Sequence, residues 1–215
     1  DNNLGVNIAS GSGNTIEFWM RKDNFVGSNS PREVIFDLWN GVSGSSNEDT
    51  PHTSEEDYGR VTVFVDNAAK GNIYVHIASG SYWQRVLGNS AYFTLDTKLT
   101  NIADKKWHHY AIVLDTSGSR HDHAVAKLYV DSKCTSREAK SDLSIFALSG
   151  TMQANIGALR TGYTNDVAAA GGTKLPSALG YGKLSGTLDE FRYWKTARTS
   201  EQVGRNYFTS IGGGT

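Results

Sequence analysis

The chain has only one cysteine, Cys134, so it cannot form an internal disulfide. Proline is also scarce: three residues leave few positions that would interrupt a β-sheet ladder. No continuous apolar run is long enough to span a bilayer. Neither sign of charge prevails, because 21 Lys and Arg residues nearly cancel 22 Asp and Glu residues. This balance argues against a nucleic-acid partner and gives no attraction to anionic membranes, so we expect neither nucleic-acid binding nor membrane insertion.

What the chain does have is length and aromatic side chains: 215 residues with five Trp, ten Tyr and eight Phe. This length suits one sizeable domain, especially an all-β one, and we assign residues 1–215 to a single domain. The first residue is Asp rather than Met, and the last four are Gly-Gly-Gly-Thr. We therefore expect the sequence to be an excerpt from a longer chain, or a processed one.

A period of two dominates the apolar residues, as in strands with one buried face. Ile16, Phe18 and Met20 share one face of residues 15–21. The same alternation recurs in four further segments: 61–65, 72–77, 126–131 and 187–194. Residues 107–115 alternate more loosely, which is typical of a strand covered on both sides. Many short strands separated by turn-forming residues predict an all-β fold, a two-sheet antiparallel β-sandwich or jelly roll.

Helix is scarce, and the clearest candidate is a short C-terminal helix over residues 200–207. Thr199 followed by Gln202 fits a capping box, in which the two side chains each satisfy a backbone N–H group. Two stretches do not fit a strand: the polar, acidic residues 40–59 and the glycine-rich residues 160–182. Long loops on a sandwich serve as binding loops or as spacers.

Five segments together carry a family resemblance: NTIEFWMR, KKWHHYAIVLD, AKLYVD, ANIGAL and GTLDEFRYWKTARTSEQV. Their order and spacing resemble the laminin G-like branch of the concanavalin A-like jelly rolls, over nearly the whole chain. The resemblance implies two packed, curved antiparallel sheets with a groove or rim used for ligands. Its members include lectin-like modules, adhesion domains and polysaccharide-cleaving enzymes, so the fold alone does not decide the function. The family usually opens with a further strand, and here the chain begins inside the segment that follows it.

Asp189 is the candidate metal ligand. Its parity predicts that it shares a buried face with Phe191 and Tyr193, where a carboxylate needs a cation or several hydrogen-bond donors. The resemblance implies that the aspartate of this motif braces the N-terminal loop, often through a structural calcium ion (Ca2+). Further oxygen ligands could come from the start of the chain: Asp1, Asn2 and Asn3. The alternative is a strand-end aspartate that accepts hydrogen bonds from backbone amides.

A sugar site needs a flat aromatic ring beside groups that can bind hydroxyls. One short span holds such groups: Tyr82, Trp83, Gln84, Arg85 and Asn89. Trp39 and Asn40 form a second candidate pair. Burial in the core is the alternative for Trp39 and Trp83, since a single Trp is more often packed than exposed.

Other polar residues have simpler interpretations. The acidic residues of segment 48–57 fit no EF-hand spacing and indicate a solvated loop. His121 and His123 have no third metal ligand near them in sequence, so we expect surface histidines. His108 and His109 follow Trp107 in a strand and are expected to make structural hydrogen bonds.

Signatures of catalysis are weak. The resemblance implies a Glu-x-Asp-x-x-Glu motif in the glucan-cleaving members, and this chain has none. Glu33 and Asp37 are four residues apart and lack an intervening carboxylate. No Gly-x-Ser-x-Gly elbow occurs, and Cys134 has only Lys133 beside it as an activator.

These observations predict a non-catalytic recognition or adhesion module that is stabilised by calcium. Its expected partner is a glycan or a cell-surface or virion protein, and its expected place is extracellular or on a virion surface. Contacts with other domains of the same chain, or with further copies, are also expected. Two alternatives stay open: a purely architectural decoration domain of a particle, and a polysaccharide hydrolase or lyase.

Overall fold

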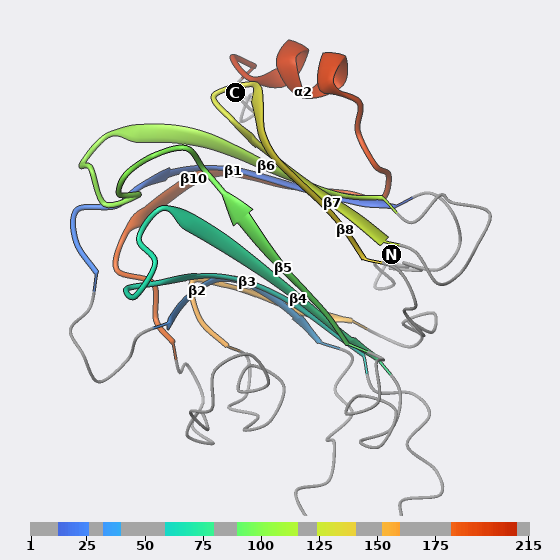
Figure 1. Cartoon of the computed structure of the whole chain (residues 1–215), viewed down its shortest axis with the longest axis horizontal. Helices are drawn as coiled ribbons and strands as arrows, with labels where there is room; N and C mark the ends of the chain where they lie inside the picture. The colour runs from blue at the N-terminus through green and yellow to red at the C-terminus, as the bar shows by residue number, and fades with distance from the viewer. Residues whose placement is uncertain are drawn as a thin grey trace, which may run out of the picture.

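The computed structural model describes seven parts of the chain: residues 13–25, 32–39, 59–79, 90–115, 124–140, 152–159 and 182–209. Within them, ten strands and one helix form a two-layer sandwich of two five-stranded antiparallel sheets (Figure 1). The strands of both layers arch in the same sense, with the helix on the convex side (Figure 1). The predicted all-β jelly-roll class is confirmed.

Sheet A has the strand order β10-β1-β6-β7-β8. The bounds of its strands are β1 Asn14–Arg21, β6 Trp107–Asp115, β7 Ala124–Val130, β8 Lys133–Lys140 and β10 Thr187–Trp194. Four of these strands match predicted segments to within two residues. The exception is β8, whose sequence KCTSREAK has no apolar period, because it is an edge strand that is nowhere fully buried.

Sheet B has the strand order β5-β4-β3-β2-β9. The bounds of its strands are β2 Arg32–Trp39, β3 Gly59–Asp66, β4 Asn72–Ser79, β5 Ser90–Asp96 and β9 Gln153–Ile156. The segments predicted at 61–65 and 72–77 are confirmed as β3 and β4. The strand β2, which lies between β3 and β9, was not predicted, because both of its faces are buried and its apolar residues do not alternate.

The inner faces of the two sheets form one apolar core. Ile16, Phe18 and Met20 of β1 are all buried in it, as their alternation predicts. Phe18 stacks on Tyr110 with ring centroids 5.5 Å apart, and lies 6.3 Å from the ring of Phe191 in β10. Sheet A thus brings its own aromatic layer to the interior.

A buried ion pair joins the two layers at one end. Lys22 follows β1 of sheet A, Glu33 lies in β2 of sheet B, and the Lys22 ammonium pairs with the Glu33 carboxylate. Lys22 Nζ also donates to the carbonyl of Ser185 at 2.8 Å, and Ser185 N–H donates to Glu33 Oε2 at 2.6 Å. Burial lowers the pKa of Lys22, against the opposing effect of Glu33.

The helix α2, Ser200–Asn206, lies over the outer face of sheet A, the face turned away from sheet B (Figure 1). It confirms the helix predicted at 200–207 and the capping box. Thr199 Oγ1 accepts from Gln202 N at 3.2 Å, and Gln202 Oε1 accepts from Thr199 N at 2.9 Å. Val203 of α2 packs in a buried apolar cluster with Ala111 and Val113 of β6. In the part of the chain that the structure describes, no helix has the length and apolarity to cross a membrane.

Candidate functional site

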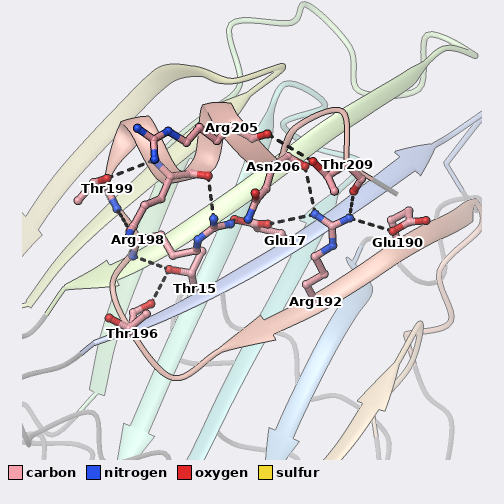
Figure 2. A network of polar contacts seen from close by, with 11 residues as sticks. Thr15, Glu17, Glu190, Arg192, Thr196, Arg198, Thr199, Arg205, Asn206 and Thr209 are labelled. Atoms are coloured by element: carbon pink, nitrogen blue, oxygen red, sulfur yellow. Dashed lines mark hydrogen bonds and ion pairs between the residues drawn. The ribbon is translucent and has the colours of Figure 1, made fainter. Parts of the chain in front are cut away.

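Glu17 is the buried carboxylate of the outer face of sheet A, and it lies in a polar network beneath α2 (Figure 2). Its side chain is 1% exposed and forms an ion pair with the guanidinium of Arg198. Arg198 also donates from Nη2 to the carbonyl of Gln202 at 2.7 Å. The Thr15 hydroxyl donates to the Thr196 carbonyl at 2.8 Å and accepts from Arg198 N–H at 3.0 Å. These contacts fix the entry to α2 on β1.

Arg192 of β10 fixes the other end of α2 (Figure 2). Its Nη1 donates to the carbonyl of Asn206 at 3.1 Å and lies 3.9 Å from Glu17 Oε2. Its Nη2 donates to the carbonyl of Thr209 and to Glu190 Oε2, the latter at 3.0 Å. Carbonyls at a helix C-terminus lack partners within the helix, and an arginine satisfies them well. The network is therefore structural, and it explains most of the polar residues of the segment 189–202.

The prediction that Asp189 shares a buried face with Phe191 and Tyr193 is wrong. The pairing of β10 with β1 shifts register at this point, and Glu190 has a φ of 50°, as in a β-bulge. Phe191 and Tyr193 still pack on the core. Asp189 is exposed instead and pairs across the strands with Trp19 on the outer face. In a regular strand Asp189 would face the same side as Phe191. The extra residue of the bulge moves Asp189, and each residue before it in β10, to the opposite face.

This correction removes the desolvation argument for a cation at Asp189. Its Oδ1 accepts a hydrogen bond from Glu190 N–H at 2.8 Å. Across the seven described parts, no group of three His, Cys, Asp or Glu side chains is placed to hold a metal ion. A single exposed carboxylate falls short of the six to eight oxygens that calcium takes. Asp1 and Asn3 lie outside the described residues, so the calcium site stays a prediction that now depends on them.

His108 is held between two carboxylates. Its Nδ1 lies 2.7 Å from Asp131 Oδ2 in the β7–β8 turn, and its Nε2 lies 3.0 Å from Asp104 Oδ2 in the loop before β6. Burial alone lowers the pKa of His108, but the hydrogen bonds with Asp131 and Asp104 more than offset burial and raise the pKa above its ordinary value. The predicted structural role of His108 in hydrogen bonding is confirmed.

His109 has the opposite environment, although it is the next residue. Its ring is 2% exposed and faces the outer side of sheet A, where Trp19 lies 5.6 Å away and Tyr207 lies 5.4 Å away. Burial, assisted by the positive charges of Arg192 and Arg198, lowers the pKa of His109 to about 4. The ring is thus neutral at physiological pH. Its backbone N–H donates to Asp131 Oδ1 at 3.0 Å, but its Nδ1 is buried without a hydrogen bond, so its ring acts as an aromatic packing group.

The environment of His108 predicts a fall in stability as the pH rises above neutrality. The folded chain holds the proton of His108 more tightly than the unfolded chain, whose histidine has the ordinary pKa of 6.5. Between that value and the raised pKa, the native state binds more protons, so the free energy of unfolding falls as the pH rises. Urea unfolding from about pH 6 to about pH 9 should show this fall in the wild type and a flatter profile in His108→Gln. An equally steep fall in His108→Gln would assign it to another group.

The outer face of sheet B, turned away from sheet A, carries a buried polar group on β2 and β3. Asp37 binds Arg60 through two parallel contacts of 2.7 Å, Nε to Oδ1 and Nη2 to Oδ2. The hydroxyl of Thr62 donates to Asp37 Oδ1 at 3.1 Å. Both members of the ion pair are fully buried. The guanidinium of Arg60 also lies 5.9 Å from the ring centre of Trp39, the residue opposite it on β2, so the pair packs against that ring.

An aromatic cluster continues this face across β3, β4 and β5. Phe64 stacks on Tyr74 with centroids 5.2 Å apart, and Tyr92 lies 5.6 Å from Tyr74. The ring of His76 lies 6.2 Å from Tyr92. Tyr74 and Tyr92 are half-buried, and burial, against the opposing charge of Arg32, raises the pKa of Tyr92 to about 12. The Tyr92 hydroxyl therefore stays protonated at neutral pH and can donate a hydrogen bond.

The strands of sheet B place the described chain ends that flank the predicted sugar-binding residues at one end of the sheet. β2 ends at Trp39 opposite the start of β3, and β4 ends at Ser79 opposite the start of β5. The described chain therefore stops before residues 40–58 and 80–89 at the same end of the sheet. Trp39 is half-buried there, which excludes full burial in the core. The other candidates lie outside the described residues and stay predictions: Asn40, Tyr82, Trp83, Gln84 and Asn89.

The two acids of β2 do not form a catalytic pair. Glu33 is opposite the core residue Val65, so it faces sheet A, and it pairs with Lys22. Asp37 is opposite Thr62 on the outer face and pairs with Arg60. A substrate on either face would meet only one of them, whereas glycoside hydrolysis needs both on the same side.

Two packed antiparallel sheets that arch in one sense define a concanavalin A-like β-sandwich. Residues 2–204 match the sequence model of a laminin G-like family, which is described as the concanavalin A-like lectin/glucanases superfamily. The chain belongs to this family. A comparison with curated protein sequences finds no match.

Solved structures of the same fold come from distant relatives. A heptameric SAP-like pentraxin from Limulus polyphemus is 13% identical, with a TM-score of 0.50 over 93% of this chain and 72% of its own. The binding domain of botulinum neurotoxin serotype D is 14% identical, with a TM-score of 0.52 over 95% of this chain and 39% of its own. The binding domain of Paraclostridial Mosquitocidal Protein 1 is 12% identical, with a TM-score of 0.50 over 91% and 37%. Identities this low show a shared fold and no more.

Proposed function

We propose that the chain is a non-catalytic, lectin-like module that binds a glycan at the Trp39 end of the outer face of sheet B. One observation carries this proposal: a half-buried tryptophan ring packs against the guanidinium of the buried Asp37–Arg60 pair at one end of sheet B, and the half-buried Tyr74 and Tyr92 lie further along the same face. A flat ring with polar groups around it is the usual means of recognising a sugar. The ligand stacks on Trp39, while the ion pair that contacts this ring holds the end of the face rigid.

The comparisons support a binding role over the two alternatives. The family joins lectins and glucanases, and two neighbours with TM-scores of 0.50 or more are themselves binding domains. A hydrolase is disfavoured by the opposite orientation of Glu33 and Asp37. A purely architectural domain needs no aromatic rings left half-exposed at the end of a sheet. An extracellular or virion-surface location, a structural calcium ion and contacts with further domains or copies belong to this proposal as predictions.

Replacing Trp39 with alanine should weaken binding about tenfold or more to any polysaccharide that the wild type retains from a mixed panel of glucans, xylans, mannans and arabinans. The loss follows from removal of the ring that stacks on the sugar, and affinity electrophoresis measures it directly. Trp83→Ala tests the other tryptophan candidate in the same assay. Ile156→Ala, which truncates an exposed side chain on β9, is the control and should bind normally. Normal binding by both tryptophan variants would refute this site, and release of shorter sugars would favour the enzyme.

A further inference from the structure

Phe208 is 85% exposed, more than any other large apolar side chain in the described parts of the chain. It lies just beyond α2, and its ring contacts that of Tyr207 at 4.1 Å between centroids. The Tyr207 ring in turn lies 5.3 Å from Trp19 and 5.4 Å from His109. Phe208 is thus the outermost ring of a continuous series of tilted and edge-to-face ring contacts that begins on the sheet.

The same face of sheet A carries a second exposed aromatic residue. Trp107 is 41% exposed and opens β6 opposite Arg21 of β1, while Trp19 is opposite His109 two residues further along. Residues at this diagonal spacing share a face and lie about 7–8 Å apart between Cα atoms. We define the aromatic platform as four residues: Trp19, Trp107, Tyr207 and Phe208.

The platform is held in position by the buried network under α2. Arg192 donates to the carbonyl of Asn206 and to that of Thr209, the residues on either side of the Tyr207–Phe208 pair (Figure 2). Arg192 is itself held by Glu190 at 3.0 Å, beside the buried Glu17. A phenylalanine whose backbone is held on both sides loses less conformational entropy when it binds a ligand than one in a free chain end.

Hydrogen-bonding groups lie beside the rings. Asp189 is exposed and lies opposite Trp19 across the strands. Within the described residues, the Asp189 carboxylate makes one hydrogen bond, at Oδ1, so Oδ2 is available to a hydroxyl group. Arg21, opposite Trp107, is 46% exposed and contacts Asp23 at 3.2 Å. The charges around the platform are of both signs, which does not favour an anionic membrane or a nucleic acid.

We infer that the aromatic platform is a second carbohydrate site, which takes the C–H face of a neutral pyranose ring on Phe208 and Trp107. Its ligand class rests on the proposed function, but its residues are separate from the Trp39 site and lie on the other sheet. Asp189 and Arg21 bind the hydroxyl groups at the edge of the sugar. A few rings offer less area than the roughly 1,000 Å² that a stable protein interface needs, whereas one sugar ring needs no more.

The five tryptophan side chains make the test selective, because each gives its own indole N–H signal in a nitrogen–proton NMR spectrum. Trp19 and Trp107 report on the platform, Trp39 and Trp83 on the proposed site, and Trp194, packed under Arg198 at 4.2 Å, is an internal reference. Cello-, manno- and xylo-oligosaccharides are titrated at millimolar concentration, each with calcium and with a chelator. Saturable shifts of Trp19 and Trp107 are expected with at least one of them.

Phe208→Ala should raise the Kd measured at Trp107 about tenfold and leave any shift at Trp39 unchanged. Ile156→Ala removes another exposed apolar side chain, 52% exposed, from the other sheet and should change neither. The inference is overturned if no oligosaccharide moves Trp19 and Trp107, or if these signals move with protein concentration alone, as in self-association. Shifts at Trp19 and Trp107 without any at Trp39 and Trp83 would support the platform and refute the proposed site instead.

Discussion

Replacing Glu17 with alanine should lower the free energy of unfolding by about 3–5 kcal/mol. The carboxylate is 1% exposed, and its partner Arg198 is 6% exposed. Removing Glu17 leaves that guanidinium beneath α2 without its counter-charge, and Arg192 loses one of its two neighbouring carboxylates but keeps Glu190 at 3.0 Å. Breaking a buried pair from one side costs more than the pair itself contributes, because the desolvated charge stays behind.

Urea unfolding at neutral pH measures the loss, and Glu201→Ala is the matched control. Glu201 is 72% exposed and pairs with Arg205 one turn away on α2. An exposed pair of this kind contributes no more than about 0.5 kcal/mol. A loss in Glu17→Ala as small as in Glu201→Ala would show that α2 does not depend on the buried network. Glu17→Gln should fall between the two, since an amide oxygen can still accept from Arg198 but carries no charge.

The elements that could be predicted from the sequence are those formed by interactions between residues close together in the chain. The faces of β1, β3, β4 and β7 follow from a strict alternation, which needs only neighbouring residues. The cap of α2 was predictable for the same reason, since Thr199 and Gln202 are three residues apart. The edge strand β8 and the doubly buried β2 were not, because neither has one apolar face.

Contacts between distant residues account for the errors. The bulge at Glu190 leaves no mark on the alternation of residues 187–194, so Asp189 was assigned to the wrong face. Glu17 lies on the face of β1 opposite Ile16, Phe18 and Met20, and no local pattern indicates that it is buried, because its burial depends on Arg198, 181 residues further along the chain. The charges alone could have suggested this pairing: Glu17 is the one acid of β1, and Arg192 and Arg198 lie in β10 and in the turn that follows it.

The two outer faces of the sandwich now have different roles. Sheet A has its outer face partly covered by α2, and the cover is fixed through charged side chains rather than through a large apolar contact. Sheet B has no described helix on its outer face, which instead buries the Asp37–Arg60 pair and leaves aromatic rings half-exposed. Buried charge thus braces both candidate binding surfaces from beneath.

Replacing Asp37 with alanine should also lower the free energy of unfolding by about 3–5 kcal/mol, because Arg60 is fully buried and loses both contacts of its guanidinium fork. Asp66→Ala is the matched control on the same face: Asp66 is 17% exposed and lies 3.6 Å from Arg32, so its loss should cost no more than about 1 kcal/mol. Asp37→Ala should also weaken glycan binding at Trp39, since that ring rests on Arg60. Equal losses of stability in the two variants would mean that Arg60 finds another partner or reaches water, and the rigid support inferred for Trp39 would be wrong.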